Sequence, residues 1–258
     1  MTKLVKRREE RAEQRAFVVE GPTLVGCALD AGAVLVDVFV DESARYDPAI
    51  SSLLDRLHDQ IEPWVLPAGT LDKVGDVVTS RGILGVVEVR DAPWPSPDTT
   101  AFVLVLDEVA DPGNAGTLVR AATAAGAGAV VFAGGVDPTS PKVVRASAGA
   151  VLAADIISAT SSYQAIERLQ AVGYRVVGTV VGGAPAYDEV DLTVPVALVL
   201  GNEAHGLHAD VVDRLDGLVT IPMVGATESL NVAMAGTVIC FEILRQRRRR
   251  GGSGADLS

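Results

Sequence analysis

Three short stretches of the sequence combine glycine with amide, carboxylate, hydroxyl and guanidinium side chains. In chain order they supply Asn114 and Arg120, then Glu203 between Gly201 and Gly206, then Ser229 and Asn231. Side chains of these types can align a hydroxyl nucleophile and stabilise the negative charge that develops on it. Because no cluster of metal ligands accompanies them, the set suits group transfer to a hydroxyl better than activation of water by a metal ion.

Apolar runs of strand length precede these polar groups. The runs are "FVLVLD" at 102–107, "VALVLG" at 196–201 and "LVTIPM" at 218–223. Open α/β sheets bind ligands beyond the carboxyl ends of their strands, and Gly201 would let the backbone approach a ligand closely. The sequence therefore predicts a ligand site built from three loops at one edge of a parallel sheet.

Structural roles for the same residues remain open at this point. Asn114 and Ser229 could each cap a helix, and the glycines around Glu203 could simply turn the chain. Asn231 is harder to explain in this way, because it is expected inside the first turn of a very apolar helix.

Several classes of site are disfavoured by the motifs. The predicted second domain has neither GxGxxG after its first strand nor GxxxxGK[ST], which argues against hydride transfer and against a P-loop nucleotide site. Cys27 and Cys240 lack metal-ligand spacing and are expected to be buried, reduced thiols. His205 and His208 have no third ligand nearby, so we assign no metal.

The chain has 258 residues, of which 48% are hydrophobic and 21% charged, enough to bury a substantial core. Pro93, Pro95 and Pro97 mark a linker. We expect an N-terminal α/β domain at 1–92, the linker at 93–100, a parallel-sheet α/β domain at 101–250 with helices on both faces, and a disordered tail at 251–258. Strands are expected in the first domain at 17–21, 34–40, 63–67 and 83–89, and in the second also at 129–134, 153–158 and 174–181.

Apolar runs long enough for a membrane span are absent, and the amino terminus lacks the apolar core of a secretory signal, so the expected location is cytoplasmic. The net charge of −11 argues against a polyanionic partner, but basic residues concentrate near both ends. They are Lys3, Lys6, Arg7, Arg8, Arg11 and Arg15, and then Arg245 and Arg247 to Arg250. Both groups of basic residues could contact phosphate. Alternatively, both could be solvated helix ends, in which case the arginines at 245–250 would complement the dipole at the carboxyl end of their helix.

Together, the three stretches resemble the three motifs of the SpoU (TrmH) family of RNA ribose 2′-O-methyltransferases. The matching residues are Asn114-x-Gly116-x-x-x-Arg120 with Gly126, then Gly201-Asn-Glu203-x-x-Gly206, then Ile221-Pro222-Met223 with Ser229-Leu230-Asn231-Val232. The segments "FVVEG" and "TSRGILGVVEV" also resemble the small RNA-binding domain that precedes the catalytic domain in many members.

The resemblance implies a SPOUT-type domain whose carboxyl third forms a trefoil knot, and a homodimer in which the active site is completed across the interface. It implies S-adenosylmethionine as cofactor, held by the backbone around Gly201, Ile221, Met223 and Leu230. It assigns catalysis to Arg120, assisted by Asn114, Glu203, Ser229 and Asn231. One departure is Ala233, where many relatives carry a small hydroxyl residue; the loop "VGATE" varies in the family and receives no role.

The separate N-terminal domain favours ribosomal RNA, most specifically 23S, as the substrate, because tRNA-directed relatives often consist of little more than the knotted domain. A tRNA ribose methyltransferase is one alternative. The other is a non-catalytic RNA-binding factor of the same fold that acts in ribosome assembly. Neither a metal nor a membrane is expected as a partner.

Overall fold

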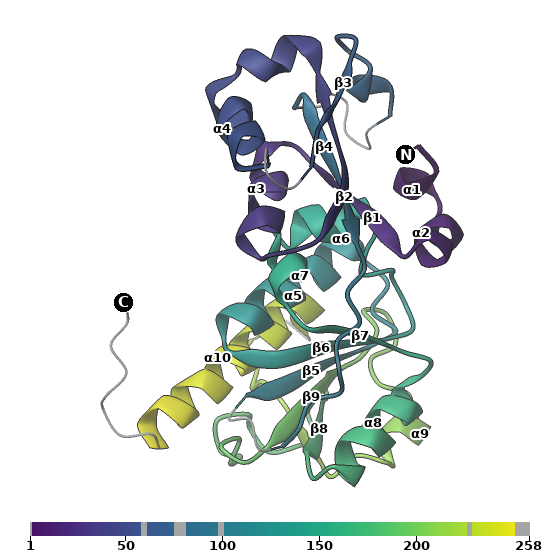
Figure 1. The fold of residues 1–258 in the computed structure, drawn as a ribbon. Helices are drawn as coiled ribbons and strands as arrows, with labels where there is room; N and C mark the ends of the chain where they lie inside the picture. The colour runs from purple at the N-terminus through teal and green to yellow at the C-terminus, as the bar shows by residue number, and fades with distance from the viewer. Residues whose placement is uncertain (1, 58–60, 75–80, 98–100, 226–228, 251–258) are drawn as a thin grey trace. The chain divides into compact units, whose positions relative to one another are not determined.

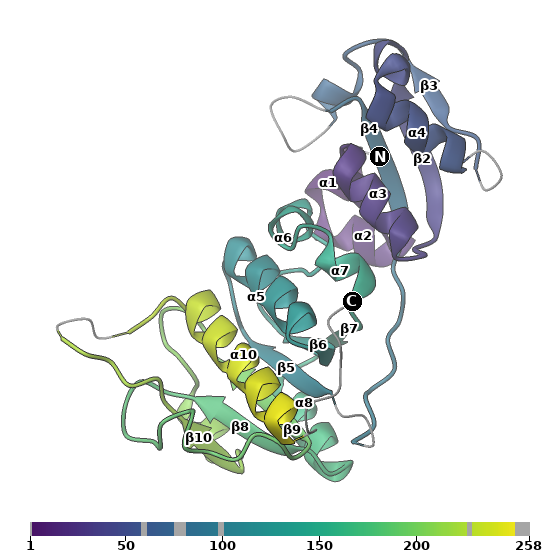
Figure 2. The same ribbon diagram turned by 90° about the vertical axis from the view of Figure 1, so that its left-hand side faces the viewer.

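The computed structural model describes residues 2–57, 61–74, 81–97, 101–225 and 229–250. Internal packing divides it into two units (Figures 1 and 2). The first unit contains the chain up to Arg90 together with Asp137–Ala153, and the second contains Asp91–Val136 together with the chain from Ala154 onward.

The first unit is built on a mixed four-stranded sheet with the strand order β1-β4-β2-β3. The strands are β1 (Ala16–Glu20), β2 (Leu35–Asp41), β3 (Trp64–Leu66) and β4 (Ile83–Glu88). The helices are α1 (Thr2–Lys6), α2 (Arg8–Gln14), α3 (Pro22–Asp30), α4 (Pro48–Leu57), α6 (Pro141–Ala146) and α7 (Ala150–Ala153), with short 3-10 turns at Glu42–Tyr46 and Leu71–Lys73. In Figure 1, α1 and α2 lie on the opposite side of the sheet from α3 and α4.

Arg11, one of the basic residues near the amino terminus, is buried rather than presented to solvent. Its guanidinium donates to Asp137 Oδ2 from Nε at 2.9 Å and from Nη2 at 2.6 Å, and to the carbonyl of Leu4 at 2.8 Å. Leu4 and Val5 are themselves part of the core over β1 and β4. The amino-terminal helices therefore belong to the packed structure of the first unit, and only part of their charge is available to a partner.

The second unit is built on a six-stranded parallel sheet with the order β10-β8-β9-β5-β6-β7. Its strands are β5 (Phe102–Asp107), β6 (Ala127–Ala133), β7 (Ile156–Ala159), β8 (Arg175–Thr179), β9 (Val196–Leu200) and β10 (Gly217–Val219). β5 and β9 are buried along their whole length, because helices cover both faces of the sheet. Between β9 and β5 the strand order reverses, which is where open α/β sheets form ligand sites.

Among the described residues, four helices cover this sheet. They are α5 (Pro112–Ala124), α8 (Ser162–Ala171), α9 (Ala209–Val212) and α10 (Val232–Arg250). In both views α5 and α10 lie side by side on one face, and α8 lies on the other (Figures 1 and 2). The contact of α10 with its neighbours is close at Gly236, where an added Cβ would lie 2.4 Å from side-chain carbons of both Leu118 and Leu200.

We expect Gly236→Ala to lower the free energy of unfolding by up to about 2 kcal/mol. Alanine gains about 1 kcal/mol over glycine inside a helix, but overpacking at this contact costs about 1–3 kcal/mol. The matched control is Gly26→Ala in α3, where the added methyl would meet only Leu53 at 3.6 Å, an ordinary contact. Thermal unfolding should therefore show a lower midpoint for the first variant alone; equal midpoints would contradict the close contact.

The fold class expected from the sequence is confirmed: a small α/β domain and a parallel α/β sheet covered on both faces. The third apolar run is shorter as a strand than expected, since β10 ends at Val219 and Ile221–Met223 lie in irregular backbone. The expected tail at 251–258 and part of the loop "VGATE" lie outside the described residues. No helix in the described ranges is long and apolar enough to cross a membrane. The knot and the numbered domain limits stay predictions.

Candidate active site

Polar residues from three loops meet at the carboxyl ends of β5 and β9, where the strand order reverses. The loop after β5 leads into α5, the loop after β9 carries Glu203, and the third loop ends at the start of α10. The structure thus brings together three of the predicted site residues, Asn114, Glu203 and Asn231, which are separated by up to 117 positions in the chain.

Glu203 joins the second loop to the first. Its carboxylate accepts hydrogen bonds from the backbone N–H of Ala110 and of Asp111 and from Nδ2 of Asn114, each at 3.0 Å. Partial burial alone would raise the pKa of Glu203, but the hydrogen bonds from Asn114, Ala110 and Asp111 outweigh it and leave the pKa below its ordinary value. Glu203 is therefore a fixed anion that shapes the loop in front of α5.

Asn114 continues this hydrogen-bond chain to the third loop. Its Oδ1 accepts from Nδ2 of Asn231 at 3.0 Å. The Oδ1 of Asn231 in turn accepts from the backbone N–H groups of Ala233 at 2.8 Å and Met234 at 3.3 Å, which caps α10. The carboxylate of Glu203 is thereby linked through two amides to the first turn of α10.

The capping interpretations of the sequence are corrected by these contacts. The residue that caps α5 is Asp111, whose Oδ1 accepts from the N–H of Asn114 at 2.8 Å, and Asn114 lies within the first turn. At α10 the capping residue is Asn231, while Ser229 lies two residues earlier, exposed and outside the helix. Asn231 therefore has both a structural role and a contact with Asn114.

Sequence reasoning missed two residues that support this site. Asp111 carries a recognisable signal, since an aspartate followed by Pro112 is typical of a helix start. Asn202 donates from Nδ2 to the carbonyl of Glu108 at 2.9 Å. Glu108 has a φ of 53°, which is uncommon for a residue other than glycine. The loop after β5 is thus held from both Asn202 and Glu203.

Arg120 is not part of this hydrogen-bond chain. It lies exposed on α5, six residues after Asn114, which puts the two side chains on different sides of the helix. Within the described ranges it makes no hydrogen bond or ion pair. Ser229 is likewise exposed. The chain therefore presents Arg120 on an exposed surface of α5 rather than in the cluster around Glu203.

The predicted cofactor residues follow the carboxyl ends of β9 and β10 or precede α10. Gly201 is buried against the turn that follows it, since a Cβ there would lie 2.4 Å from the carbonyl carbon of Gly206. Ile221 and Met223 are partly exposed, and Leu230 is exposed. Accessible apolar side chains of this kind and the backbone beside them suit an adenosine group, which needs apolar contact and backbone hydrogen bonds.

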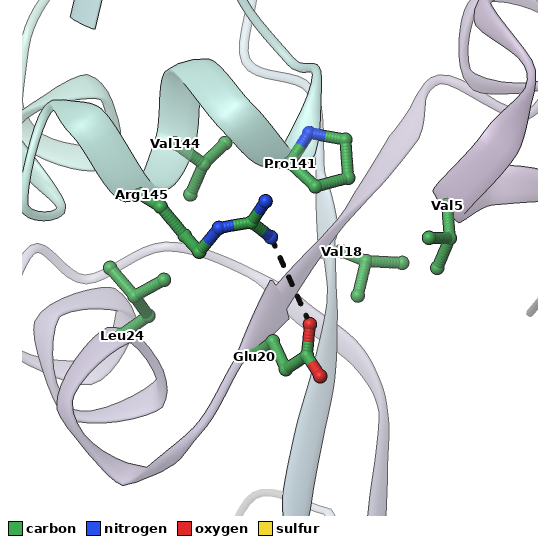
Figure 3. A pocket seen from close by; sticks show the side chains of 7 residues that line it. All are labelled: Val5, Val18, Glu20, Leu24, Pro141, Val144 and Arg145. Atoms are coloured by element: carbon green, nitrogen blue, oxygen red, sulfur yellow. Dashed lines mark ion pairs between the residues drawn. The ribbon is translucent and has the colours of Figure 1, made fainter. Parts of the chain in front are cut away.

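Other candidate sites are weaker. The structure shows no group of three or more potential metal ligands among its described residues. Cys240 is buried, which raises the pKa of its thiol to about 12, whereas Cys27 is only half-buried. The first unit has a small pocket where Arg145 approaches Glu20 at 4.0 Å beside apolar side chains (Figure 3). This ion pair ties α6 to β1.

Comparison with known proteins gives consistent results. The model of the SpoU rRNA Methylase family matches residues 101–241. The 23S rRNA (guanosine(2553)-2′-O)-methyltransferase RlmP of Bacillus subtilis is 29% identical over 92% of this chain and 91% of its own length. The AdoMet-bound rRNA methyltransferase from Sinorhizobium meliloti is similar in structure, with a TM-score of 0.83 and 31% identity over 95% of this chain and 92% of that one. The A. aeolicus TrmH/SpoU tRNA modifying enzyme covers 59% of this chain and 78% of its own, with a TM-score of 0.55 and 27% identity.

Proposed function

The chain belongs to the SpoU rRNA Methylase family of S-adenosylmethionine-dependent RNA 2′-O-methyltransferases, and from this premise we propose that it methylates a ribose of 23S ribosomal RNA. The hydrogen-bond chain from Glu203 through Asn114 to Asn231 is the observation that carries the proposal, because it organises all three motif loops at one sheet edge. Similarity to the two ribosomal RNA enzymes extends over both units, whereas the tRNA enzyme matches little more than half of the chain. The proposal keeps the cytoplasmic location expected from the sequence.

The reaction is an in-line displacement. S-adenosylmethionine supplies a methyl group that its sulfonium already activates. The ribose 2′-oxygen forms the new C–O bond as the S–CH₃ bond breaks, and the hydroxyl proton passes to solvent. The protein's part is to align the hydroxyl and to stabilise the charge on its oxygen.

Each site residue then has a defined part in the proposal. Arg120 stabilises the developing alkoxide; it is not the base, because a guanidinium stays protonated at neutral pH. Asn114 and Asn231 position the ribose and its phosphate, and Glu203 holds both amides in place. Ser229 contributes a hydroxyl beside the same loop. The backbone around Gly201, Ile221, Met223 and Leu230 holds the cofactor.

The homodimer is part of this proposal, because Arg120 has to meet the other residues. α10 exposes an apolar stripe made of Met234, Val238 and Phe241, with Leu230 just before the helix. Ile239 on the same helix is fully buried within the unit and does not belong to the stripe. Because α5 packs beside α10, a partner on the stripe also approaches the free surface around Arg120.

We expect Phe241→Glu to convert a dimer into a monomer at micromolar concentration, since it places a charge in the apolar stripe. Sedimentation equilibrium measures the mass, and methyl transfer should fall with the dimer fraction. Val172→Glu is the control, because Val172 is 44% exposed after α8, on the other face of the sheet. A wild-type chain that sediments as a monomer of 26.7 kDa would contradict the assembly.

The substrate is tested by mapping ribose 2′-O-methylation in RNA from cells with and without the gene. A 23S position that loses its methyl group supports the proposal. A tRNA position that does so instead would establish the tRNA alternative. If no position changes and titration with S-adenosylmethionine shows no binding at millimolar concentration, the chain is a non-catalytic member of the family.

A further inference from the structure

Arginine side chains surround the carboxyl-terminal turn of α10. Arg247, Arg248, Arg249 and Arg250 are consecutive, so successive side chains point about 100° apart and together encircle the helix. Arg248, Arg249 and Arg250 are exposed, and the described part of the chain offers no hydrogen bond or ion pair to the first two. This concentration of positive charge occurs in a chain whose net charge is −11.

The end of α10 is held firmly, although helix ends usually fray. Gln246 donates from Nε2 to the carbonyl of Val190 at 3.0 Å and accepts from the N–H of Leu192 at 2.9 Å. Arg247 donates to the carbonyl of Val194 at 3.2 Å and lies 5.8 Å from the ring centre of Phe102. These contacts fix the helix axis, so Arg248 and Arg249 are presented at a defined place.

Nearby acidic groups do not neutralise this end of the helix. Glu242 is engaged by Arg245, which donates to its two carboxylate oxygens at 2.6 Å each. Arg250 is bonded to Thr193, and Arg175 reaches the carbonyl of Asp191 at 3.5 Å. Arg248 and Arg249 remain exposed and without a hydrogen bond or ion pair among the described residues. The hydrogen bonds from Arg245, and in smaller part the charge of Arg249, lower the pKa of Glu242.

We propose that Arg248 and Arg249 bind the phosphate backbone of the RNA substrate, at a point about 27 Å along α10 from its capped end. The inference rests on the proposed function, because it takes RNA to be the substrate. A second copy of the chain is the less suitable occupant: a helix partner needs charge on one face, whereas these arginines point in different directions. The RNA backbone carries a phosphate at every nucleotide, so it can bind guanidinium groups that point in different directions from the helix.

The test compares full-length wild type with the double variant Arg248→Ala, Arg249→Ala for binding to protein-free 23S ribosomal RNA between 50 and 200 mM salt. Each lost phosphate contact reduces the steepness of log K against log salt by about 0.7–0.9. Because the variant loses two contacts, raising the salt from 50 to 200 mM should weaken its RNA binding by a factor roughly ten times smaller than the factor for wild type. Binding at low salt should be weaker than in wild type, while cofactor affinity and melting temperature stay unchanged. The charge-retaining variant Arg248→Lys, Arg249→Lys should keep most of the affinity.

The control is the double variant Arg168→Ala, Arg214→Ala, which removes two positive charges, as the test variant does. Arg168 lies in α8 and Arg214 lies just after α9, and both are exposed. It should bind RNA with the wild-type salt slope. Equal slopes for the wild type and the Arg248, Arg249 alanine variant would overturn the inference, as would loss of RNA affinity that merely follows loss of the dimer in sedimentation. If either result is found while wild type still methylates RNA, only the phosphate-binding role of Arg248 and Arg249 is wrong. If wild type does not methylate RNA, the proposed function itself is wrong.

Discussion

Replacing Arg120 with Ala is expected to slow single-turnover methyl transfer by roughly 100- to 1000-fold, the usual loss when a group that stabilises transition-state charge is removed. Melting temperature should not fall, because the side chain is exposed and unbonded within the described ranges and alanine is the best helix former. Affinity for S-adenosylmethionine should also be retained, since the cofactor residues are assigned to other loops. Calorimetry and single-turnover methylation on the same preparation measure both quantities.

Two further variants make this result specific. Arg120→Lys should recover little activity, because a compact ammonium does not reproduce the planar fork that can engage a phosphate and the 2′-oxygen together. Arg168→Ala, which removes an exposed arginine on the other face of the sheet, should be fully active. If Arg120→Ala retains a tenth of wild-type turnover, the catalytic assignment is wrong; if it loses stability and cofactor binding together, the role is structural.

The second large effect is expected at Glu203. Glu203→Ala removes the acceptor for three hydrogen bonds, so the loop before α5 loses its anchor and Asn114 loses its orientation. We expect turnover to fall by about 100-fold, as when catalytic groups lose their alignment, with the loss in kcat larger than the change in KM. His205→Ala is the matched control, because His205 is an exposed residue of the same loop. Equal turnover in the two variants would exclude a positioning role for Glu203.

The pH dependence of stability gives a second measurement on the same residue. The pKa of Glu203 lies below its ordinary value of 4.5 in the folded chain, so its ionised form contributes stability at neutral pH. That contribution is complete above the pKa of the unfolded chain and is lost as pH falls through the lower folded value. Wild type should therefore lose more stability than Glu203→Gln when the pH is lowered from 6 toward 3, as the folded and unfolded pKa values dictate.

The sequence predicted the strands better than the contacts between distant residues. Within the described residues each expected apolar run overlaps a strand, although β10 shares only Leu218 and Val219 with its run, and the fully buried strands β5 and β9 follow their runs most closely. The burial of Arg11 was not predictable in this way, since its partner Asp137 lies 126 positions away. Likewise, the choice of Asp111 over Asn114 as helix cap depends on backbone geometry that both residue types tolerate.

The candidate site was also only partly predictable. The presence of Glu203, Asn114 and Asn231 at strand exits followed from the apolar runs, but their direct hydrogen bonds depend on the order of strands in the sheet. The six-residue spacing indicates that Arg120 and Asn114 lie on different sides of the helix, but it does not indicate that Arg120 is left exposed. The homodimer that we propose would bring that residue to the others, and a single sequence contains no direct record of such packing.

The discontinuous make-up of the first unit has a consequence for synthesis. Its residues up to Arg90 leave the ribosome early, but Arg11 cannot form its bonds to Asp137 until that residue has also been made. Similarly, α3 packs on the later segment at Gly149, which is so close to Cys27 that a Cβ added to the glycine would lie within 3 Å of that side chain. Domains usually fold in the order in which they are made. Here the amino-terminal unit is completed only after two strands of the next one have been translated, so a nascent chain stalled near residue 92 would carry an unfinished core.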